Sequence, residues 1–447
     1  MAGTVQRVVL AGGGHAHLAV LDDWARAPLP GVEKWLVTAA PFTAYSGMIP
    51  GWIAGHYPPG AHRIDLRPLA RRAGATLVID SVEALDADKR RLTLASGRTV
   101  DFDVLSLAVG GEVDTGPLSQ LAGRLLPVRP MDAFAENWPA VLESASGQQN
   151  FSLVVVGGGA AGIELAFAAE YALRQISANA KVSLVAGEPG ILAGHSRAVI
   201  AYVREELARR NIEIFPADAV GTRDSVVLST GEAISADFVI AATGSTPPSW
   251  LAGSGLALDG QGFVEIGSDL KSRSHPNIFA AGDIVTRTDV QVARSGVHAV
   301  HAGPALAANL RATFDGASLR RYIPRKRTLY LLATGDRRAI LSWGGLAARG
   351  RSIWLLKDWI DRRFVRRHTV RAKESAAKLG RRMITNPVRG NALRVALVVG
   401  TCLNVINQGA DIWLLGELDL PRFLMNYAVP YLVASYSAAK ARGLMDS

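Results

Sequence analysis

The residues in this sequence best suited to chemistry are glycines, grouped in two loops that each follow a short apolar run and precede a helical pattern. The first loop comes after residues 7–10 and has the spacing G-x-G-x-x-H. Glycine lets the backbone turn tightly and approach a pyrophosphate at the helix N-terminus. The loop predicts dinucleotide contacts from Gly12, Gly13, Gly14, His15 and His17. His17 stands where Gly or Ala is usual, so it either places an imidazole beside the phosphates or has a packing role.

A second loop, residues 157–162, has the complete spacing G-x-G-x-x-G. It predicts a second dinucleotide site with contacts from Gly157, Gly159 and Gly162. An acid at the end of the next strand would bind the ribose 2′-hydroxyl of NADH, whereas a basic group there would bind the 2′-phosphate of NADPH. Glu188 stands at that point and favours NADH, but a histidine and an arginine follow it, so either cofactor is left open.

A third signal lies late in the chain, where a short buried strand ends in Gly282 and Asp283 and an apolar helix is predicted from about residue 295 to 310. Gly282 allows the backbone to approach a ligand closely, and Asp283 can accept a hydrogen bond from a ribityl hydroxyl. A helix N-terminus stabilises the negative charge of a reduced flavin. Ser295 and Gly296, at the start of this helix, therefore belong to the predicted site.

The order of these signals, two glycine loops and then Ala-Gly-Asp, resembles that of flavoprotein reductases with two dinucleotide-binding folds. The resemblance implies FAD in the first fold and NADH or NADPH in the second. It also implies that Glu164 lies near the nicotinamide, with a helix-surface position as the alternative. Further cofactor contacts implied by the resemblance are Tyr45, Ser46, Gly47, Met48, Val82, Val109, Gly110 and Gly244.

The first predicted fold lacks the acid that usually ends its second strand. That strand, residues 34–38, ends in Thr38, and two alanines and a proline follow. The acid would bind the adenosine ribose. Either Thr38 or a backbone group takes this contact, or the ribose is held less tightly.

Composition limits the chemistry. The chain has 447 residues, enough for two or three domains. Its only cysteine, Cys402, excludes an intrachain disulfide, a redox-active cysteine pair and a persulfide relay. The net charge is +10, and residues 351–390 hold 12 Lys or Arg against three Asp or Glu. Such a block predicts an acidic partner, either nucleic acid or anionic lipid.

Several longer segments resemble one branch of these reductases, the NADH dehydrogenase-like FAD proteins often joined to selenide, water dikinase. The segments are GGGHAH, AYSGMIPG, AGDI, SGVHAVHAGPALAANLR and TGDRRAILSWGGLAARGRSIWLLKDWIDRRF, within residues 5–370. The resemblance implies FAD and NADH or NADPH, and it does not identify an electron acceptor. His298 and His301 are expected on the acceptor side, where His298 is the candidate for proton transfer; a buried structural role is the alternative.

Residues 352–368 show a basic amphipathic pattern. Trp354, Leu355, Trp359 and Phe364 are predicted to share one apolar side, with arginines around it. This suits a helix that lies in an anionic membrane interface. It equally suits a helix that packs on the body of the protein and exposes a basic face.

Two apolar stretches follow, at residues 392–406 and 423–439. Each is close to the length that spans a bilayer. Cations flank their outer ends at Arg381, Arg382, Arg389, Lys440 and Arg442, so both ends are predicted to be cytoplasmic. We predict a membrane hairpin, with a buried helical hairpin in a dimer interface as the alternative. The apolar spans make anionic lipid a better partner than nucleic acid for the basic block.

The hairpin segments ALRVALVVGTCLNVINQG and YAVPYLVASYSAAKAR resemble the NrtS family of two-span nitrate/nitrite transporters, over residues 388–442. Asn404, Asn407 and Gln408 lie where the first span ends. Polar groups within a membrane often mark a ligand path, although these amides can equally cap the helix end. Transport by two spans would require a homo-oligomer, because one hairpin cannot enclose a path.

These observations predict an α/β protein with an FAD-binding fold (residues 1–115 and 265–318) interrupted by an NAD(P)H-binding fold (116–264). A small α+β interface domain (319–387) and a helical membrane hairpin (388–447) complete the expected architecture. The expected protein is a membrane-associated FAD-dependent oxidoreductase, similar to type II NADH dehydrogenases, that passes electrons to a quinone or another acceptor. It is expected on the cytoplasmic side of the inner membrane. The alternative is nitrate or nitrite transport or sensing by the hairpin, coupled to the flavoprotein.

Overall fold

The computed structural model describes residues 5–177, 179–369, 383, 386–410 and 419–445. The chain divides into two compact units, residues 1–370 and 371–447. The predicted flanking cations Arg381 and Arg382 lie outside the described residues, as do residues 411–418 of the connection between the two apolar stretches. The finer boundaries predicted between the two dinucleotide-binding folds stay predictions.

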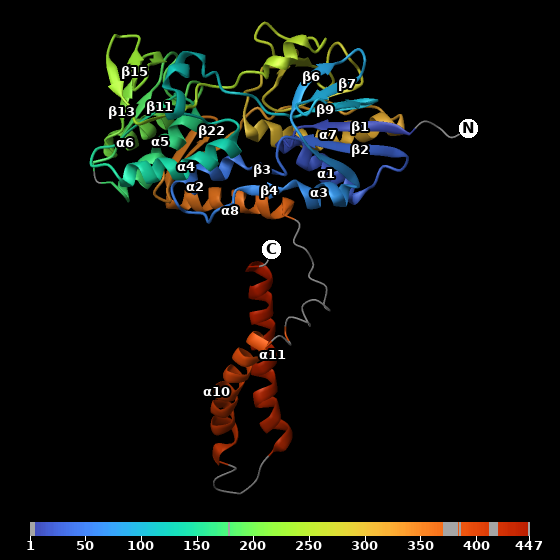
Figure 1. The fold of residues 1–447 in the computed structure, drawn as a ribbon, viewed down its shortest axis with the longest axis vertical. Coiled ribbons are helices and arrows are strands. Elements are labelled where there is room, and N and C mark those ends of the chain that lie inside the picture. The colour runs from blue at the N-terminus through green and yellow to red at the C-terminus, as the bar shows by residue number, and fades with distance from the viewer. Residues whose placement is uncertain (1–4, 178, 370–382, 384–385, 411–418, 446–447) are drawn as a thin grey trace. The chain divides into compact units, whose positions relative to one another are not determined.

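The first α/β layer of unit 1 is a five-stranded parallel sheet in the order β19-β9-β1-β2-β5. Its strands are β1 (Gln6–Ala11), β2 (Val32–Thr38), β5 (Ala75–Ile79), β9 (Val104–Leu107) and β19 (Ile278–Ala280). Its helices are α1 (His15–Arg26), α3 (Leu66–Ala73) and α7 (Gly296–Asp315), and α1 packs against both others. Residues far apart in the sequence therefore complete one sheet, since β19 pairs with β9. Helix α7, from the same late part of the chain, packs beside α1 (Figure 1).

The second α/β layer repeats this plan with the parallel order β10-β17-β11-β12-β13. Its strands are β10 (Leu125–Pro127), β11 (Ser152–Val156), β12 (Lys181–Val185), β13 (Glu213–Phe215) and β17 (Phe238–Ala241). Its helices are α4 (Met131–Ser146), α5 (Ala160–Arg174) and α6 (Arg197–Arg209). A strand that is buried on both faces has a continuous run of apolar residues. The sequence therefore predicts β1 and β11.

Smaller elements join the two layers. Antiparallel three-stranded sheets flank them as β6 (Val82–Asp86), β7 (Arg91–Leu94) and β8 (Thr99–Asp101), and as β14 (Ala219–Gly221), β15 (Ser225–Leu228) and β16 (Ala233–Ser235). Two-stranded sheets are β3 (Phe42–Ala44) with β4 (Arg63–Asp65), and β18 (Val264–Ile266) with β20 (Val285–Arg287). A final antiparallel sheet comprises β21 (Leu329–Ala333), β22 (Ala339–Trp343) and β23 (Leu346–Gly350). The short helices η1 (Ser46–Met48), α2 (Ile49–Ile53), η2 (Gly116–Arg124) and η3 (Ser249–Gly253) lie in the connections.

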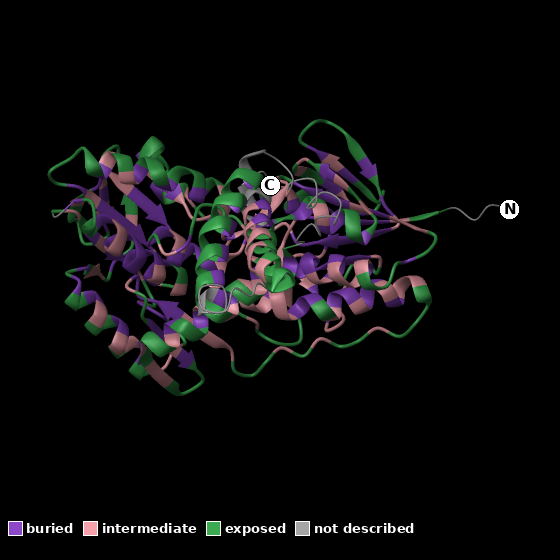
Figure 2. Cartoon of the chain, turned by 90° about the horizontal axis from the view of Figure 1, so that it is seen from below, coloured by how far each residue is buried: buried purple, intermediate pink, exposed green. Residues whose placement is uncertain are grey.

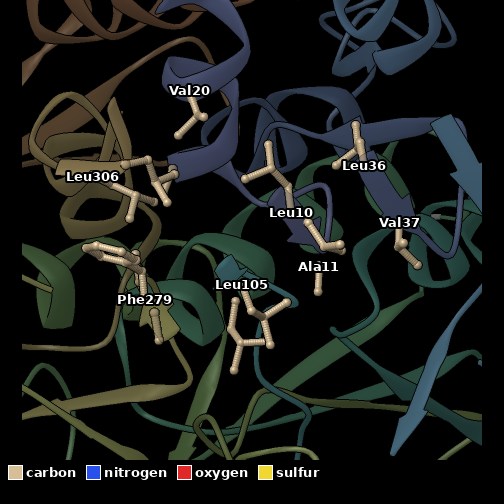
Figure 3. Close-up of a cluster of buried hydrophobic side chains, with 14 of the residues drawn as sticks. Leu10, Ala11, Val20, Leu36, Val37, Leu105, Phe279 and Leu306 are labelled. Carbon is tan, nitrogen blue, oxygen red and sulfur yellow. The ribbon is translucent and has the colours of Figure 1, made fainter. Parts of the chain in front are cut away.

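The core of the first layer lies between its sheet and the helices α1 and α7. Figure 3 shows part of this core, with side chains from Leu10, Ala11, Val20, Leu36, Val37, Leu105, Phe279 and Leu306. Phe279 is fully buried, although it belongs to a strand of three residues. Burying a side chain of this size contributes roughly 1.5–3 kcal/mol, so the core holds β19 and the turn that follows it in place.

Helix α8 (Arg351–His368) packs on β21, β22, β23, β4 and η1, but not with the predicted apolar side. Trp354 is buried and Phe364 packs within the first core, whereas Leu355 and Trp359 are 53% and 54% exposed. The prediction that these four residues share one face was wrong. The inward face has a helical spacing of buried residues, Trp354, Lys357, Asp361, Val365 and His368. The outward face combines exposed apolar side chains with arginines. Figure 2 colours the ribbon of the chain by the burial of each residue.

The second unit is a pair of packed helices, α10 (Asn386–Ala410) and α11 (Leu420–Met445). The contact face of α10 recurs every four residues, at Val388, Ala392, Ala396, Gly400, Asn404 and Gln408. The other faces of α10 expose large apolar side chains, including Leu397 and Val398, and α11 exposes Leu424 and Val433. Among the described residues, one segment is long and apolar enough to cross a membrane, Val388–Gln408 in α10.

The buried position of Phe279 gives a test of the core. Phe279→Ala should lower the free energy of unfolding by about 3–5 kcal/mol, because it removes a fully buried ring and leaves a cavity. Urea denaturation followed by circular dichroism measures the change. The control Ile323→Ala, at a position 82% exposed, should stay within about 0.5 kcal/mol of the wild type. Equal effects of the two substitutions would contradict this description of the core.

Candidate functional site

Two clefts open at the carboxyl ends of the parallel sheets, where open α/β sheets bind their ligands. The first encloses about 370 Å³ and the second about 530 Å³. Of the predicted cofactor contacts, the first cleft is lined by Gly12, Gly13, Gly14, His15, Thr38, Ser46, Val82, Val109, Gly110, Gly282, Asp283 and Gly296. The second cleft is lined by Gly157, Gly159, Glu188 and Gly244. Residues predicted separately along the chain are thus gathered at two sites.

The glycine loops are required by close approach of the backbone. Gly12 has φ +98°, and a Cβ there would collide with the carbonyl group of Ala108 on the neighbouring strand connection. Gly157 has φ +135°, and a Cβ there would collide with the carbonyl group of Ala242. Both positions combine a left-handed backbone with a lack of space, so only glycine fits. Each loop then leads into a helix, α1 or α5, whose N-terminus can bind an anionic group at the loop.

His17 lies beneath the first loop and does not line the cleft. Its Nδ1 lies 2.6 Å from the carbonyl oxygen of Gly12, and its Nε2 lies 2.8 Å from Ser106 Oγ. A carbonyl oxygen can only accept, so Nδ1 carries the proton and Nε2 accepts from the serine hydroxyl. Burial lowers the pKa of His17 to about 4, which keeps this bridge neutral. The side chain of His17 therefore connects the first glycine loop to β9.

The adenosine end of the first cleft contains an acid that the sequence did not reveal. Thr38 is the last residue of β2 and lines the cleft. Asp80 also lines the cleft and directly follows β5, the strand that pairs with β2. Asp80 Oδ2 accepts a hydrogen bond of 2.5 Å from Ser96 Oγ, and Asp80 Oδ1 accepts one of 2.8 Å from the N–H of Ser81. A carboxylate in this position can bind a ribose hydroxyl. Asp80, after β5, can therefore take the role of the acid that is absent at the end of β2.

The Ala-Gly-Asp turn places a carboxylate with a free oxygen in the first cleft. Asp283 Oδ2 forms an ion pair of 2.6 Å with Arg129, while Oδ1 is buried and has no hydrogen-bond partner among the described residues. His15 Nε2 and Ser295 Oγ are buried without partners in the same way. Buried polar atoms in native proteins are nearly always hydrogen-bonded. Asp283 and His15 line the first cleft, so their two free atoms indicate a polar ligand, and a ribityl chain with its hydroxyls fits them.

The loop beside the first cleft is fixed by α8. Lys357 Nζ donates a hydrogen bond of 2.9 Å to the carbonyl oxygen of Gly47. It also forms ion pairs with Asp361 Oδ2 at 3.2 Å and Glu164 Oε1 at 3.7 Å. Tyr45 stacks on Phe364 of α8 with ring centroids 4.4 Å apart. Tyr45, Gly47 and Met48, predicted as cofactor contacts, thus support the cleft from behind Ser46 rather than line it.

The side chain of Glu164 is only 15% exposed and points toward α8 and β21. Its Oε1 accepts a hydrogen bond of 2.7 Å from the backbone N–H of Ala333, and it faces Lys357. Burial raises the pKa of Glu164, although Lys357 opposes the rise. Burial alone would lower the pKa of Lys357, but Glu164 and Asp361 together hold it above its usual value. The Lys357 ammonium therefore lies between the carboxyl groups of Glu164 and Asp361, where the two α/β layers meet β21 and α8.

The remaining predicted residues lie beside the clefts. His298 is on the first turn of α7, where its Nε2 lies 3.4 Å from Thr328 Oγ1 and its Nδ1 is buried without a partner in the described part of the chain. Burial lowers its pKa. Gly162 lies behind the second loop, against the carbonyl of Gly157. Ser295 caps α7 next to Gly296. The roles predicted for these residues stay predictions.

The charged side chains that line the second cleft are acidic. Its described lining contains Asp114, Glu188 and Asp218 and no Lys or Arg. Its one basic side chain, His195, has a pKa lowered by burial, and its Nδ1 lies 2.8 Å from Ser342 Oγ on β22. Asp218 was not predicted, because it follows β13 and approaches Gly187 only in the folded chain.

Comparison with known proteins agrees with this geometry. The sequence signature of the pyridine nucleotide-disulphide oxidoreductase family matches residues 6–304. The chain belongs to this family. Its cofactors are FAD and NADH or NADPH, and it has the Rossmann-type fold of the family. The first cleft, with its free Asp283 and His15 atoms, fits FAD, and the second fits NADH or NADPH.

Individual relatives share parts of the chain. Dihydrolipoyl dehydrogenase of Geobacillus stearothermophilus is 34% identical over 146 residues, which are 30% of each protein. An NADH dehydrogenase-like protein of Mycobacterium tuberculosis is 27% identical over 234 residues, which are 50% of this chain and 58% of that protein. The chain thus spans about a third to three fifths of the length of these two relatives. The fold of sulfide:quinone oxidoreductase from Aquifex aeolicus matches with a TM-score of 0.68 at 18% identity, covering 83% of this chain and 96% of that one.

The buried neutral His17 gives a pH prediction. Its pKa is about 4 in the folded protein against 6.5 for an ordinary histidine. The unfolded chain therefore takes up the proton first, so the stability from neutral His17 is present above pH 6.5 and is lost as pH falls toward about 4. The loss should approach roughly 3 kcal/mol. His17→Ala should lose correspondingly less stability than the wild type between these pH values, as measured by urea denaturation. Parallel pH profiles would contradict the placement of His17.

The balance of buried charges gives a second prediction for the site. Lys357→Met leaves Glu164 and Asp361 without their cation, which should cost about 3–5 kcal/mol of stability. The pKa of Glu164 should rise further, so the variant should lose stability as pH rises through that pKa, where a buried carboxylate must ionise. Arg363→Met, on the exposed face of the same helix, is the control and should change stability by about 0.5 kcal/mol or less. A stable Lys357→Met variant without this pH dependence would contradict the proposed balance.

Proposed function

We propose that the protein takes hydride from NADH and passes the electrons to a quinone at an anionic membrane surface. The proposal depends on the two different faces of α8, one directed to the flavin cleft and one exposed and apolar. Its inner face reaches Gly47 beside the flavin cleft through Lys357, while its outer face exposes Leu355, Leu356 and Trp359. Quinones dissolve in the bilayer, so a quinone reductase needs a lipid-facing surface close to its flavin.

The second half of the proposal concerns how electrons leave the flavin. FAD supplies the chemistry of hydride acceptance and electron release. The chain has one cysteine, Cys402, which lies in α10 and belongs to the second unit, so no thiol pair relays the electrons. Overall, NADH, one proton and quinone would give NAD⁺ and quinol. The name of the structurally similar sulfide:quinone oxidoreductase supports a quinone as acceptor for a protein of this fold.

The residues of the chain would bind and orient the reactants. The two glycine loops hold the pyrophosphates at the N-termini of α1 and α5. Lys357 and Glu164 fix the Gly47 loop and β21 between the two clefts. His298, whose Nδ1 has no hydrogen-bond partner among the residues that the structure describes, is the proposed group for proton transfer on the acceptor side. Hydride transfer depends mainly on such positioning of two rings.

NADH is the proposed electron donor in preference to NADPH. Glu188 and Asp218 line the second cleft, and its described lining has no Lys or Arg to neutralise a 2′-phosphate. A phosphate placed beside two carboxylates would be repelled, whereas ribose hydroxyls can donate hydrogen bonds to them. The donor choice therefore follows from the charge of the cleft.

The helical hairpin is proposed as the anchor, with both ends of the chain segment on the cytoplasmic side of the inner membrane. Its exposed apolar faces, including Leu397 and Leu424, support contact with lipid. A second candidate function is nitrate or nitrite handling, which the resemblance of this segment to the NrtS family suggested. Buried amides inside an apolar helix pair favour it. However, Asn404 Oδ1 accepts from Gln408 and Asn426, and Gln408 Oε1 accepts from Asp419, so the amides satisfy one another.

An anaerobic visible spectrum of the detergent-purified full chain tests the proposal. The protein should carry a flavin spectrum, NADH should bleach it at least about tenfold faster than NADPH at equal concentration, and a soluble quinone should restore it. The factor corresponds to about 1.4 kcal/mol of discrimination by the acidic cleft. A bleached flavin that nitrite restores and quinone does not would move the activity to the second candidate. A protein that binds no FAD would contradict the oxidoreductase proposal.

A further inference from the structure

Arg129 lies where the chain passes between the two dinucleotide-binding layers. It follows β10, and two other segments meet it there, residues 109–112 and 243–246, which are joined by a β-bridge between Glu112 and Thr246. Its Nη2 lies 2.6 Å from Asp283 Oδ2, and its Nη1 donates a hydrogen bond of 2.9 Å to Ser245 Oγ. One guanidinium thus connects the Ala-Gly-Asp turn of the first layer with the chain that leaves the second.

The charge of the first cleft depends on this residue. Of the described residues that line the cleft, Arg129 is the single Lys or Arg. The same lining contains four acids, Asp80, Glu112, Asp132 and Asp283. His15 also lines the cleft, but burial lowers its pKa to about 4, so it adds no charge near neutral pH. Without Arg129 the described lining would contain only negative charges.

The position of the ion pair makes its charges effective. The side chains of Arg129 and Asp283 are only 21% and 12% exposed. Charges shielded from water interact more strongly with a bound group than exposed ones do. Hydride transfer to a flavin adds one negative charge to the ring system. An unpaired Asp283 would oppose that charge, and an unpaired Arg129 would favour it.

We propose that Arg129 is the positioning residue that sets the reduction potential of the bound flavin, because it neutralises Asp283 and holds it against the flavin site. The inference rests on the proposed function only in requiring bound FAD. In the wild type the pair has no net charge, and Asp283 keeps Oδ1 free to accept from the ribityl chain. Arg129 thereby lets an acid bind the flavin without opposing its reduction.

The test is the midpoint potential of the bound flavin, measured by dithionite titration against a reference dye, which needs no NADH turnover. Arg129→Gln should weaken binding of reduced relative to oxidised FAD about tenfold, a fall of about 30 mV for a two-electron couple. Asp283→Asn should raise the potential by a similar amount. The double variant Arg129→Gln/Asp283→Asn again has no net charge, so its potential should return close to that of the wild type. A purely structural role would not produce this return.

Two controls keep the test decisive. Arg124→Gln removes another arginine, whose Nη1 donates to the carbonyl of Ala236 away from the first cleft, and should leave the potential unchanged. Arg129→Lys keeps the charge and should stay near the wild type. If Arg129→Gln retains no FAD, the midpoint potential of Asp283→Asn is compared with that of the wild type. A rise of about 30 mV supports the proposed ion pair, and an unchanged potential would overturn it.

The outcomes separate this inference from the proposed function. A wild type without FAD would overturn both. A wild type that binds FAD and oxidises NADH, together with variants whose potentials do not move or move with the same sign, would overturn the role of Arg129 alone. A double variant that keeps the low potential of Arg129→Gln would also overturn it.

Discussion

The burial of the Lys357 ammonium is the constraint on which the region between the two clefts depends. An unpaired charge in this position would cost several kcal/mol, so Lys357 requires Glu164 and Asp361, and they require it. The three groups come from α5 and α8, and the hydrogen bond from Lys357 to Gly47 adds the loop beside the flavin cleft. A helix that begins 177 residues after the end of α5 therefore determines the position of two segments at the site.

A second set of buried charges acts in the same way at the other side of the NAD(P) layer. Arg210, whose side chain is 3% exposed, forms ion pairs with Glu170, Glu206 and Asp336. These residues come from α5, from α6 and from the turn between β21 and β22. The small antiparallel sheet is thus attached to the NAD(P) layer by ion pairs and to the flavin loop through α8.

The sequence was sufficient for the features that depend on local order. The glycine loops, the Ala-Gly-Asp turn and the two α/β layers were predicted because each follows from a run of apolar residues and a turn whose backbone needs glycine. Asp80, Arg129, Asp218 and Lys357 were missed because each reaches the site from a segment with no fingerprint of its own. The face of α8 was assigned incorrectly for a related reason. Its buried residues include a lysine and an aspartate, which a count of apolar residues assigns to the surface.

The order of the segments along the chain has a consequence for biosynthesis. The first sheet receives four of its strands before residue 108, but β19 and α7 come after the whole NAD(P) layer has been made. Domains fold as units, and the N-terminal ones fold first during synthesis. Here the inserted layer can complete its sheet while the layer that encloses it still lacks an edge strand and the helix beside Asp283. A nascent chain that has emerged to about residue 265 therefore possesses a complete site for the nicotinamide cofactor before it possesses one for the flavin.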